Sequence, residues 1–572
     1  MLEKLKLKLA RAEALPLLII LGMLTGLFAG VIIICFRLLV ESIQAQFLAQ
    51  GDPESYETLS MAMRFVLPLA GALFIGVIFQ WLSRGAISIG VTHVLERLAY
   101  HQGQLPFKNF LAQFFTAAVS IIAGHSVGRE GPGVHLGAAG GSFIGQWMKL
   151  PNNTLRILVA CGAAASIAAS FNTPIAGVIF AMEVIVMEYT LAGFAPIIIS
   201  AVSATILTQA MFSGAPVFSS VSTLQLSTLS ELSALLVMGV VVGALAAAFI
   251  WILREVTVRT AKLHFMLRML IAGGVTGVLA MGVPQIMGIG YDTVNLAMAG
   301  EMALGILAMI VIAKLIATAI GLGMGLPGGL IGPTLVIGAV AGGFIGIVMQ
   351  SITGSDATSV GFYAMLGMAA MMGATLQAPL AALMALLELT VNTHVILPGM
   401  LVVIIAGLTS SHLFRQQGVF LMLLKARGLD FSNSPVAQLL RRIGVSSVMS
   451  RSFKQHDHIL NRSQATDLLK SEPEWIVIRK ESKPVAVMPS TELANYLGMH
   501  EEEEIDLLEI PGQRYDSDLV QVRDTLQVAL EKMDEKQLNV LCVGFQPANA
   551  TAEPRIEGIV TRHMIETHYR YR

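Results

Sequence analysis

Two apolar runs of the sequence meet at the pentapeptide Gly128-Arg129-Glu130-Gly131-Pro132. The runs 109–128 and 131–148 contain no Asp, Glu, Lys or Arg. An ionised residue inside a membrane segment costs about 2.5–3.5 kcal/mol on insertion scales, so such a residue usually has a function. The glycines let a helix begin abruptly, and a helix N-terminus attracts anions. The pentapeptide therefore predicts an anion site that contains an acidic side chain. The alternative is that Glu130 only pairs with Arg129 at a membrane surface.

The composition divides the chain into a membrane part and a soluble part. Of its 572 residues, 55% are hydrophobic and 13% are charged, against about 25% charged in soluble proteins. More than half of the charged residues follow Lys425. We therefore predict an all-α multi-pass membrane domain over 1–432 and a small cytoplasmic α/β domain over 433–572. The net charge of −1 gives no indication of nucleic-acid binding.

The apolar windows also predict interrupted helices. A single span needs about 20 apolar residues, so long windows such as 189–230 and 315–355 are expected to hold two helices each. The window 131–148 is short and rich in glycine, which is typical of helices that stop partway through the membrane. Basic residues at Lys4, Lys8 and Arg11 favour a cytoplasmic N-terminus and an uncleaved first helix. We expect a cell (inner) membrane location with both termini in the cytoplasm.

The membrane part repeats itself. Gly131-Pro132 precedes Gly137-Ala138 at the spacing with which Gly332-Pro333 precedes Gly338-Ala339. Further along each half, a proline stands nine residues before a glutamate, as Pro174 before Glu183 and Pro379 before Glu388. Two structurally similar halves place a transport site at their interface. The stretch Gly328-Gly329-Leu330-Ile331-Gly332-Pro333 predicts a second helix start facing the first, although close packing through small residues is an equally good interpretation of this motif alone.

In this order and spacing, the motifs resemble the CLC family of anion channels and transporters over roughly residues 15–430. The pentapeptide at 128–132 resembles the family's outer-gate motif, and the stretch at 328–333 resembles its G-x-F-x-P filter motif, with Ile331 in place of phenylalanine. The resemblance implies a homodimer in a lipid bilayer with one anion pathway per subunit and Glu130 as the gate. It implies an anion site at the following residues: Ser88, Ile89, Gly90, Gly128, Arg129, Gly131, Leu330, Ile331 and Phe420.

Three positions depart from the family pattern. Ile89 stands where the family's G-S-G-I-P filter has its central serine, and Phe420 stands where a tyrosine hydroxyl is usual. Because both hydroxyl donors are missing, backbone N–H groups are expected to coordinate most of the inner anion. Val184 occupies the position, directly after Glu183, at which proton-exchanging relatives carry a second glutamate. Glu183 and Val184 therefore mark a proton path that we expect to be interrupted.

The C-terminal part resembles a pair of CBS domains. Residues 475–478 and 485–488 are expected to be strands before a helix near Ser490, and 540–543 and 558–560 before a second helix near Thr561. Residues 448–450 are expected to open the first unit, and 520–530 the second. The nucleotide-binding pattern is degraded, with Pro489 and Glu492 in the first repeat and Thr561 and Met564 in the second. The resemblance thus implies weak or absent binding of adenosine nucleotides.

The predicted function is proton-uncoupled movement of chloride or a related small anion, without a cofactor or a metal. Within the family, the alternatives are H⁺-coupled exchange and carriage of another anion such as bicarbonate or nitrate. His93, His125 and His135 lie near the filter segments and could relay protons or contact an anion, although hydrogen bonding within the helix bundle is the more common role. A CBS-regulated cation transporter and a membrane-anchored sensor are more distant alternatives. We find no enzyme signature such as a P-loop, HExxH or a nucleophile elbow.

Overall fold

The computed structural model describes most of the chain and divides it into two units. The described residues are 15–48, 54–83, 87–212, 218, 231–353, 360–429, 440, 443–480, 483–545 and 554–570. One unit comprises Leu18–Gln146 and Arg156–Phe431, and the other comprises Ser432–Arg572 with Met1–Leu17 and Trp147–Leu155. The basic residues 4–11, and the second helix expected within 189–230, lie outside the described residues.

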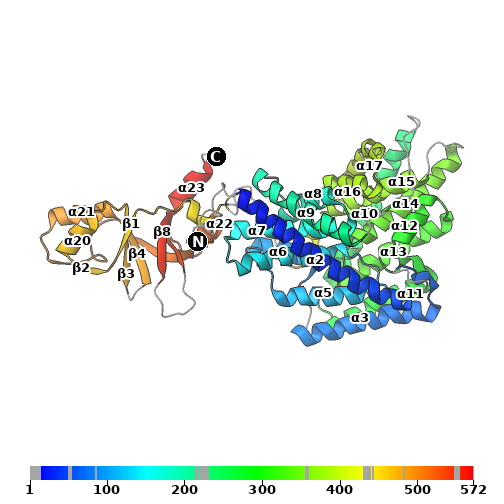
Figure 1. Ribbon diagram of the computed structural model, residues 1–572, viewed down its shortest axis with the longest axis horizontal. Helices are drawn as coiled ribbons and strands as arrows, with labels where there is room; N and C mark the ends of the chain where they lie inside the picture. Colours follow the sequence, from blue (N-terminus) through cyan, green and yellow to red (C-terminus); the bar gives the residue numbers. More distant parts are fainter. Residues whose placement is uncertain are drawn as a thin grey trace. The chain divides into compact units, whose positions relative to one another are not determined.

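The larger unit is helical, as predicted, and each half begins with long membrane-length helices (Figure 1). The first half contains α2 (Leu15–Phe47), α3 (Met61–Ser83), α4 (Gly90–Tyr100), α5 (Phe107–Ile122), α6 (Glu130–Trp147), α7 (Asn152–Phe171), α8 (Pro174–Phe180), the π-helix η3 (Ala181–Val186) and α9 (Leu191–Met211). The second half contains α10 (Glu231–Thr260), α11 (Phe265–Gly282), α12 (Tyr291–Ala299), α13 (Leu304–Met324), α14 (Ile331–Thr353), α15 (Val360–Leu376), α16 (Pro379–Thr390), α17 (Ile396–Leu408), the π-helix η6 (Thr409–Leu413) and α18 (Val419–Ala426).

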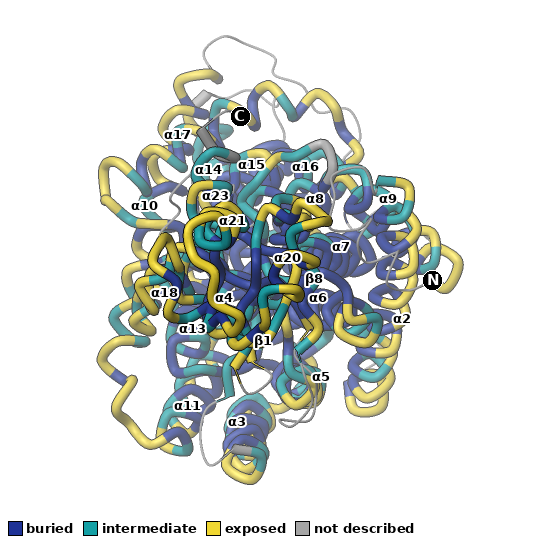
Figure 2. The backbone as a smooth tube through the Cα atoms, turned by 90° about the vertical axis from the view of Figure 1, so that its left-hand side faces the viewer, coloured by how far each residue is buried: buried dark blue, intermediate teal, exposed yellow. Residues whose placement is uncertain are grey.

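Burial separates the inner helices from those that face lipid. Among the described residues, nine helices are long and apolar enough to cross a membrane. In α7, 89% of the span is buried by protein, against 33% in α3. Figure 2 shows the same contrast, with α7 and much of α6 in dark blue and yellow stretches along α2 and α10. An apolar helix that stays exposed needs lipid around it. The chain is therefore a multi-pass membrane protein.

The repeated Gly-Ala motifs are contact points between helices. A Cβ atom added at Gly137 of α6 would lie 2.3 Å from the carbonyl oxygen of Gly162 in α7. In the second half, a Cβ atom added at Gly338 of α14 would lie 2.3 Å from the carbonyl oxygen of Gly367 in α15. Only glycine permits backbones to approach so closely. The same type of close helix crossing therefore occurs once in each half, which explains why the Gly-Ala motif is repeated at the same spacing.

The repeated Pro–Glu pairs cap each other's helices. The Glu183 carboxylate, in η3 after α8, accepts N–H groups of Ala381 at 2.8 Å and Leu380 at 3.4 Å, at the start of α16. The Glu388 carboxylate, in α16, accepts N–H groups of Ile175 at 2.9 Å and Ala176 at 2.7 Å, at the start of α8. A carboxylate at a helix N-terminus satisfies free donors and complements the helix dipole. Each half therefore stabilises the other by the same contact.

We predict that Glu388→Gln and Glu183→Gln each lower the thermal unfolding midpoint of the purified protein in detergent. Each substitution replaces a charge-assisted pair of hydrogen bonds by a neutral one and costs about 1–2 kcal/mol, since the site is only partly buried. The matched control is Glu255→Gln, because Glu255 pairs on the surface of α10 with Arg259, whose side chain is 77% exposed. Midpoints equal to that of the control would show that the reciprocal caps contribute no stability.

The smaller unit is an α/β domain consistent with a CBS pair. Its elements are β1 (Phe453–Asp457), β2 (Ile459–Asn461), α20 (Arg462–Leu469), β3 (Trp475–Lys480), β4 (Lys483–Pro489), α21 (Ser490–Met499), β5 (Glu504–Asp506), β6 (Tyr515–Gln521), α22 (Leu526–Glu535), β7 (Val540–Phe545), β8 (Arg555–Thr561) and α23 (Arg562–Arg570). The main sheet has the order β1-β3-β4-β6-β7-β8, in which β1–β3 and β6–β7 are parallel pairs. The four strands expected from the sequence are β3, β4, β7 and β8.

One expectation for this unit is wrong. Residues 448–450 were expected to open the first repeat, but they pack on the second. Ser450 and Ile559 of β8 exchange backbone hydrogen bonds of 2.8 and 2.9 Å. Met449 is buried in the cluster that also contains Val520 and Leu526. The apolar side chains of this segment fit the core of the second repeat. The chain therefore contacts the second repeat first and only afterwards, from β1 onward, forms the strands and helices of the first repeat.

Candidate anion-binding site

A pair of glycines joins the two predicted motifs. Gly128 and Gly329 form an antiparallel bridge, with N–H to carbonyl distances of 2.7 and 2.8 Å. A Cβ atom added at Gly329 would lie 2.5 Å from the backbone nitrogen of Gly131, so the contact requires glycine. Helices α6 and α14 therefore begin side by side, at Glu130 and Ile331. The bridge also occupies the N–H groups of Gly128 and Gly329, so in this conformation they are not free to bind an anion.

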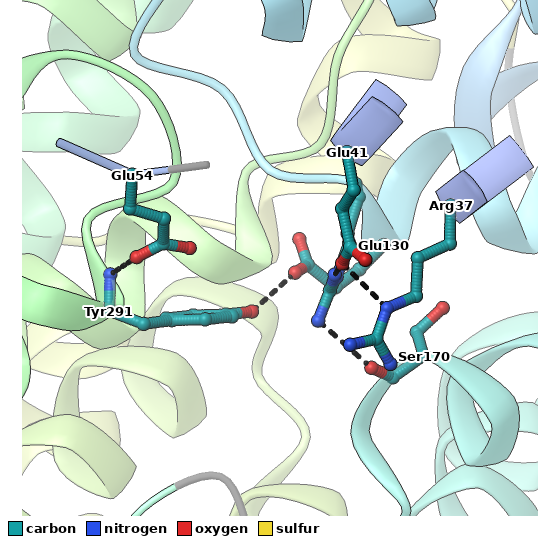
Figure 3. Close-up of polar contacts among 7 residues, drawn as sticks. Arg37, Glu41, Glu54, Glu130, Ser170 and Tyr291 are labelled. Carbon is teal, nitrogen blue, oxygen red and sulfur yellow. Dashed lines mark hydrogen bonds and ion pairs between the residues drawn. The ribbon is translucent and has the colours of Figure 1, made fainter. Parts of the chain in front are cut away.

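The Glu130 carboxylate lies at the N-terminus of α14. Its side chain is fully buried, and Oε2 accepts the N–H of Gly332 at 3.1 Å. Its other oxygen, Oε1, accepts the hydroxyl of Tyr291 at 2.8 Å (Figure 3). The carboxylate thus fills the position in which the free N–H groups of a helix start would hold an anion. A carboxylate and an anion cannot both occupy that position.

Tyr291 is held in place by a glutamate from the loop between α2 and α3. Glu54 Oε2 accepts the N–H of Tyr291 at 2.7 Å and the N–H of Asp292 at 3.1 Å, at the first turn of α12 (Figure 3). Burial, followed by the negative charge of Asp292, raises the pKa of Glu54 to about 7. The residue that fixes the start of α12, and with it the hydroxyl on Glu130, therefore changes charge near neutral pH.

Arg129 pairs with a different carboxylate. Its Nη1 lies 3.4 Å from Oε1 of Glu41, and its Nη2 donates to the carbonyl oxygen of Ser170 at 3.2 Å. Glu41 also pairs with Arg37 at 2.6 Å, as Figure 3 shows. These contacts engage both terminal nitrogens of the guanidinium without Glu130, while its buried Nε has no partner among the described residues. They favour the functional interpretation of Glu130 over simple pairing with its neighbour.

A cavity of about 480 Å³ opens beside the two helix starts. Seven of the nine residues predicted to bind the anion line it, namely Ser88, Ile89, Gly90, Gly131, Leu330, Ile331 and Phe420. Gly128 and Arg129 are not among its lining residues. Arg268 and Arg427 also line the cavity and give it positive charge. Neither arginine was among the predicted site residues. The available signal for Arg268 was its position directly before the charge-free stretch 269–291.

Helix α4 starts at the cavity, but its first N–H is already engaged. Ile89 is the residue before α4, and the N–H of Gly90 donates to Oε1 of Gln113 at 2.7 Å. Gln113 lies on α5 and lines the same cavity. Gln113 was not among the predicted site residues. The available signal was an amide in the interior of the apolar window 109–128, in which Asn109 is the other amide residue.

Two of the three histidines form a buried pair. Nδ1 of His93 lies 2.8 Å from Nε2 of His135, and both side chains are buried. Nε2 of His93 is 3.5 Å from Nδ2 of Asn109, which also donates to the carbonyl oxygen of Ser88 at 2.8 Å. His125 is buried elsewhere, where Gly71 approaches it. Only the first two histidines can therefore exchange a proton directly.

The proton-path and CBS positions are also located. Val184 is buried in η3, and Glu183 beside it caps α16. Pro489 precedes α21, and Glu492 lies in its first turn. Thr561 precedes α23, where its hydroxyl accepts the N–H of Met564 at 3.2 Å. The four CBS positions thus stand at equivalent strand-to-helix turns of the two repeats.

The comparisons with known proteins agree with this geometry. Residues 71–411 match the family model described as voltage gated chloride channel. The chain is 33% identical over 372 residues to a putative chloride channel protein ClcB-like of Ralstonia nicotianae, covering 64% of this chain and 86% of that protein. It is 29% identical over 405 residues to the H(+)/Cl(-) exchange transporter ClcA of Yersinia pestis, covering 68% of this chain and 84% of that protein.

Solved structures share the fold. A slow cyanobacterial Cl-/H+ antiporter superposes with a TM-score of 0.64 at 23% identity, over 73% of this chain and 99% of that one. A eukaryotic CLC transporter superposes with a TM-score of 0.61 at 18% identity, over 96% of this chain and 97% of that one. The family model spans more than half of the sequence and includes both glycine-framed helix starts. The chain therefore belongs to the voltage-gated chloride channel (CLC) family.

Proposed function

We propose that the protein moves a small monovalent anion, with chloride the first candidate, past the starts of α6 and α14, and that Glu130 is the gate. The main observation in support of this proposal is that the Glu130 carboxylate accepts a hydrogen bond from the N–H of Gly332, at the start of α14. The side chain must leave this position before an anion can take it. Arg268 and Arg427 in the cavity would concentrate anions at the entrance.

We further propose that anion movement is not coupled to protons in a fixed ratio. Val184 cannot bind a proton, and the Glu183 carboxylate is engaged by the N–H groups that begin α16. Proton transfer across the apolar interior needs a protonatable group at its inner end as well as at Glu130. Neither Glu183 nor Val184, the two residues at the expected inner position, supplies a free protonatable group while Glu183 caps α16.

H⁺-coupled anion exchange is the second candidate. The relatives named as H(+)/Cl(-) exchange transporters favour it, as does the contact between His93 and His135. An imidazole pair can hold and pass a proton without a carboxylate at position 184. The two candidates differ in one measurable quantity, the number of protons moved per anion.

Two further features of the proposal concern assembly and location. Apolar side chains on α16 and α17 are exposed, including Leu380 at 48% and Leu397 at 78%. These positions suit either lipid or the matching surface of a second copy, and we propose a homodimer in the cell (inner) membrane with cytoplasmic termini. Of the four CBS positions, Pro489 and Met564 lack a hydrogen-bonding side chain, and only Glu492 and Thr561 retain one. Because neither repeat keeps the full pattern, we propose weak or no binding of adenosine nucleotides.

The proposal is tested by anion flux from proteoliposomes loaded in turn with chloride, nitrate and bicarbonate, with internal pH recorded simultaneously. Chloride efflux that requires the protein would support an anion pathway. Absence of efflux for all three anions, from protein that remains monodisperse, would contradict it.

The contact between Tyr291 and Glu130 yields a separate prediction. Tyr291→Phe removes one of the two hydrogen bonds on the carboxylate, so the gate leaves its position more readily and chloride flux should rise about tenfold. The matched control is Tyr363→Phe in α15, because that ring is also buried but lies outside the site. Equal flux in wild type and Tyr291→Phe would mean that the hydroxyl does not hold the gate.

A further inference from the structure

The side-chain amide of Gln113 is fixed in one orientation. Gln113 lies on α5, its side chain is fully buried, and Oε1 accepts the N–H of Gly90 at 2.7 Å. A backbone N–H can only donate, so the group facing Gly90 must be the carbonyl oxygen of the amide. The amino group, Nε2, is therefore the end of the side chain that remains available.

This amino group has no hydrogen-bond partner among the described residues, and it is buried. Leaving a buried donor unpaired costs about 1–3 kcal/mol, and native structures contain few such groups. Gln113 lines the same cavity as Ile89, Ile331 and Phe420, which offer apolar side chains. A bound group that accepts hydrogen bonds would remove the penalty, and the positive charge of Arg268 in the same cavity favours an anionic one.

We propose that Gln113 is an anion-coordinating residue, which supplies the side-chain donor that Ile89 and Phe420 cannot. Its Nε2 donates to a small monovalent anion, while Oε1 stays on the N–H of Gly90. The Gly90 N–H polarises the amide and strengthens Nε2 as a donor. The helix start at Gly90 therefore acts on the anion through the glutamine rather than directly. This inference rests on the proposed anion transport and names a residue that selects the anion.

The test uses the full-length protein with chloride and nitrate as probes. Gln113→Glu keeps an oxygen for the Gly90 N–H but replaces the donor by a second oxygen, so it separates anion binding from support of α4. Gln113→Leu removes both functions. Ser120→Ala is the matched control, because Ser120 is a buried polar residue of the same helix that does not line the cavity.

Chloride affinity is measured by calorimetric titration in detergent, and selectivity by the ratio of chloride to nitrate efflux from proteoliposomes. We expect Gln113→Glu and Gln113→Leu to weaken chloride binding at least about tenfold and to change the efflux ratio, and Ser120→Ala to behave as wild type. Adding Ile89→Ser to Gln113→Leu should restore part of the affinity, since it introduces a hydroxyl at the same cavity.

Two results would overturn the inference. Unchanged affinity and unchanged selectivity in Gln113→Glu would show that the amino group does not meet the anion. Weak binding in Gln113→Leu that Ile89→Ser does not improve, together with normal binding in Gln113→Glu, would assign Gln113 to holding α4. If wild type itself neither binds nor moves chloride or nitrate, the proposed function fails and the role of Gln113 fails with it, whereas an effect missing only in the Gln113 variants contradicts the role of Gln113 alone. The efflux ratio does not depend on the amount of folded protein, so a poorly expressed variant still gives a decisive result.

Discussion

Glu130→Gln is expected to increase chloride flux about tenfold or more and to weaken its dependence on pH between about pH 5 and 8. The carboxylate is bound by Tyr291 and Gly332 because it is charged, and a hydrogen bond to a charged group contributes about 1.5–3 kcal/mol. Glutamine keeps the shape of the side chain but loses this attraction. An anion then competes for the N-terminus of α14 without having to displace a negative charge. The measurement is chloride efflux from proteoliposomes at a series of pH values.

The control for this substitution is Glu301→Gln. Glu301 is an exposed carboxylate just beyond α12, so its removal changes the net charge equally without touching the gate. Wild-type rates and a wild-type pH profile in purified Glu130→Gln would remove Glu130 from the gating role. Part of the wild-type pH profile is expected to arise at Glu54, whose pKa of about 7 places its change of charge within the range examined. Below that pH the neutral group holds the start of α12 less firmly.

The features that the sequence predicts well are those encoded in neighbouring residues. Glycines next to Glu130 and Ile331 indicated two abrupt helix starts, and α6 and α14 begin at those residues. The four strands expected in the CBS pair were also predicted correctly, because short β-branched runs alternate there with charged stretches that form helices. These elements follow from local propensity and hydrophobic pattern, so tertiary contacts were not needed to predict them.

The contacts that build the site depend on distant residues, and the sequence did not reveal them. The hydroxyl of Tyr291 reaches Glu130 across 161 positions, and Gln113 reaches Gly90 across 23. In the sequence, both residues look like ordinary members of an apolar helix or of its first turn. Their roles become visible only once the hydrogen bond between Gln113 and Gly90 and the packing of α12 against α14 are known. A single sequence contains no signal for which polar side chain will face a particular backbone N–H.

Glu183 illustrates how a correct pattern can receive an incomplete interpretation. The repeated Pro–Glu spacing correctly indicated two equivalent halves, and Glu183 was considered as part of a proton path. Its carboxylate instead accepts the first N–H groups of α16, while Glu388 does the same for α8. The duplication accounts for both caps at once, because a pseudo-symmetric pair of helices needs the same residue twice.

The second large effect concerns protons. A chloride gradient imposed on proteoliposomes is expected to drive no protons uphill, because the inner end of the path lacks a free protonatable group at Val184 and Glu183. The pair formed by His93 and His135 is the remaining candidate for that end. Asn109 Nδ2 lies beside Nε2 of His93, so that nitrogen is best assigned as an acceptor, and the proton between the rings then belongs to His93. A further proton would place a positive charge on a fully buried pair, which costs free energy unless an anion lies close by.

Internal pH, recorded during chloride efflux with the membrane potential clamped, decides between the two mechanisms. Anion flux with no change in pH supports the uncoupled pathway. Sustained uphill proton movement that disappears in Glu130→Gln would refute the uncoupled pathway and favour exchange.

If protons do move uphill, His135→Asn tests whether the histidine pair is the inner proton site, because asparagine keeps a polar side chain in α6 but cannot carry a proton between anion steps. Loss of proton movement with retained chloride flux in this variant would assign the role to the histidine pair. Retained coupling would instead require a protonatable group outside this pair.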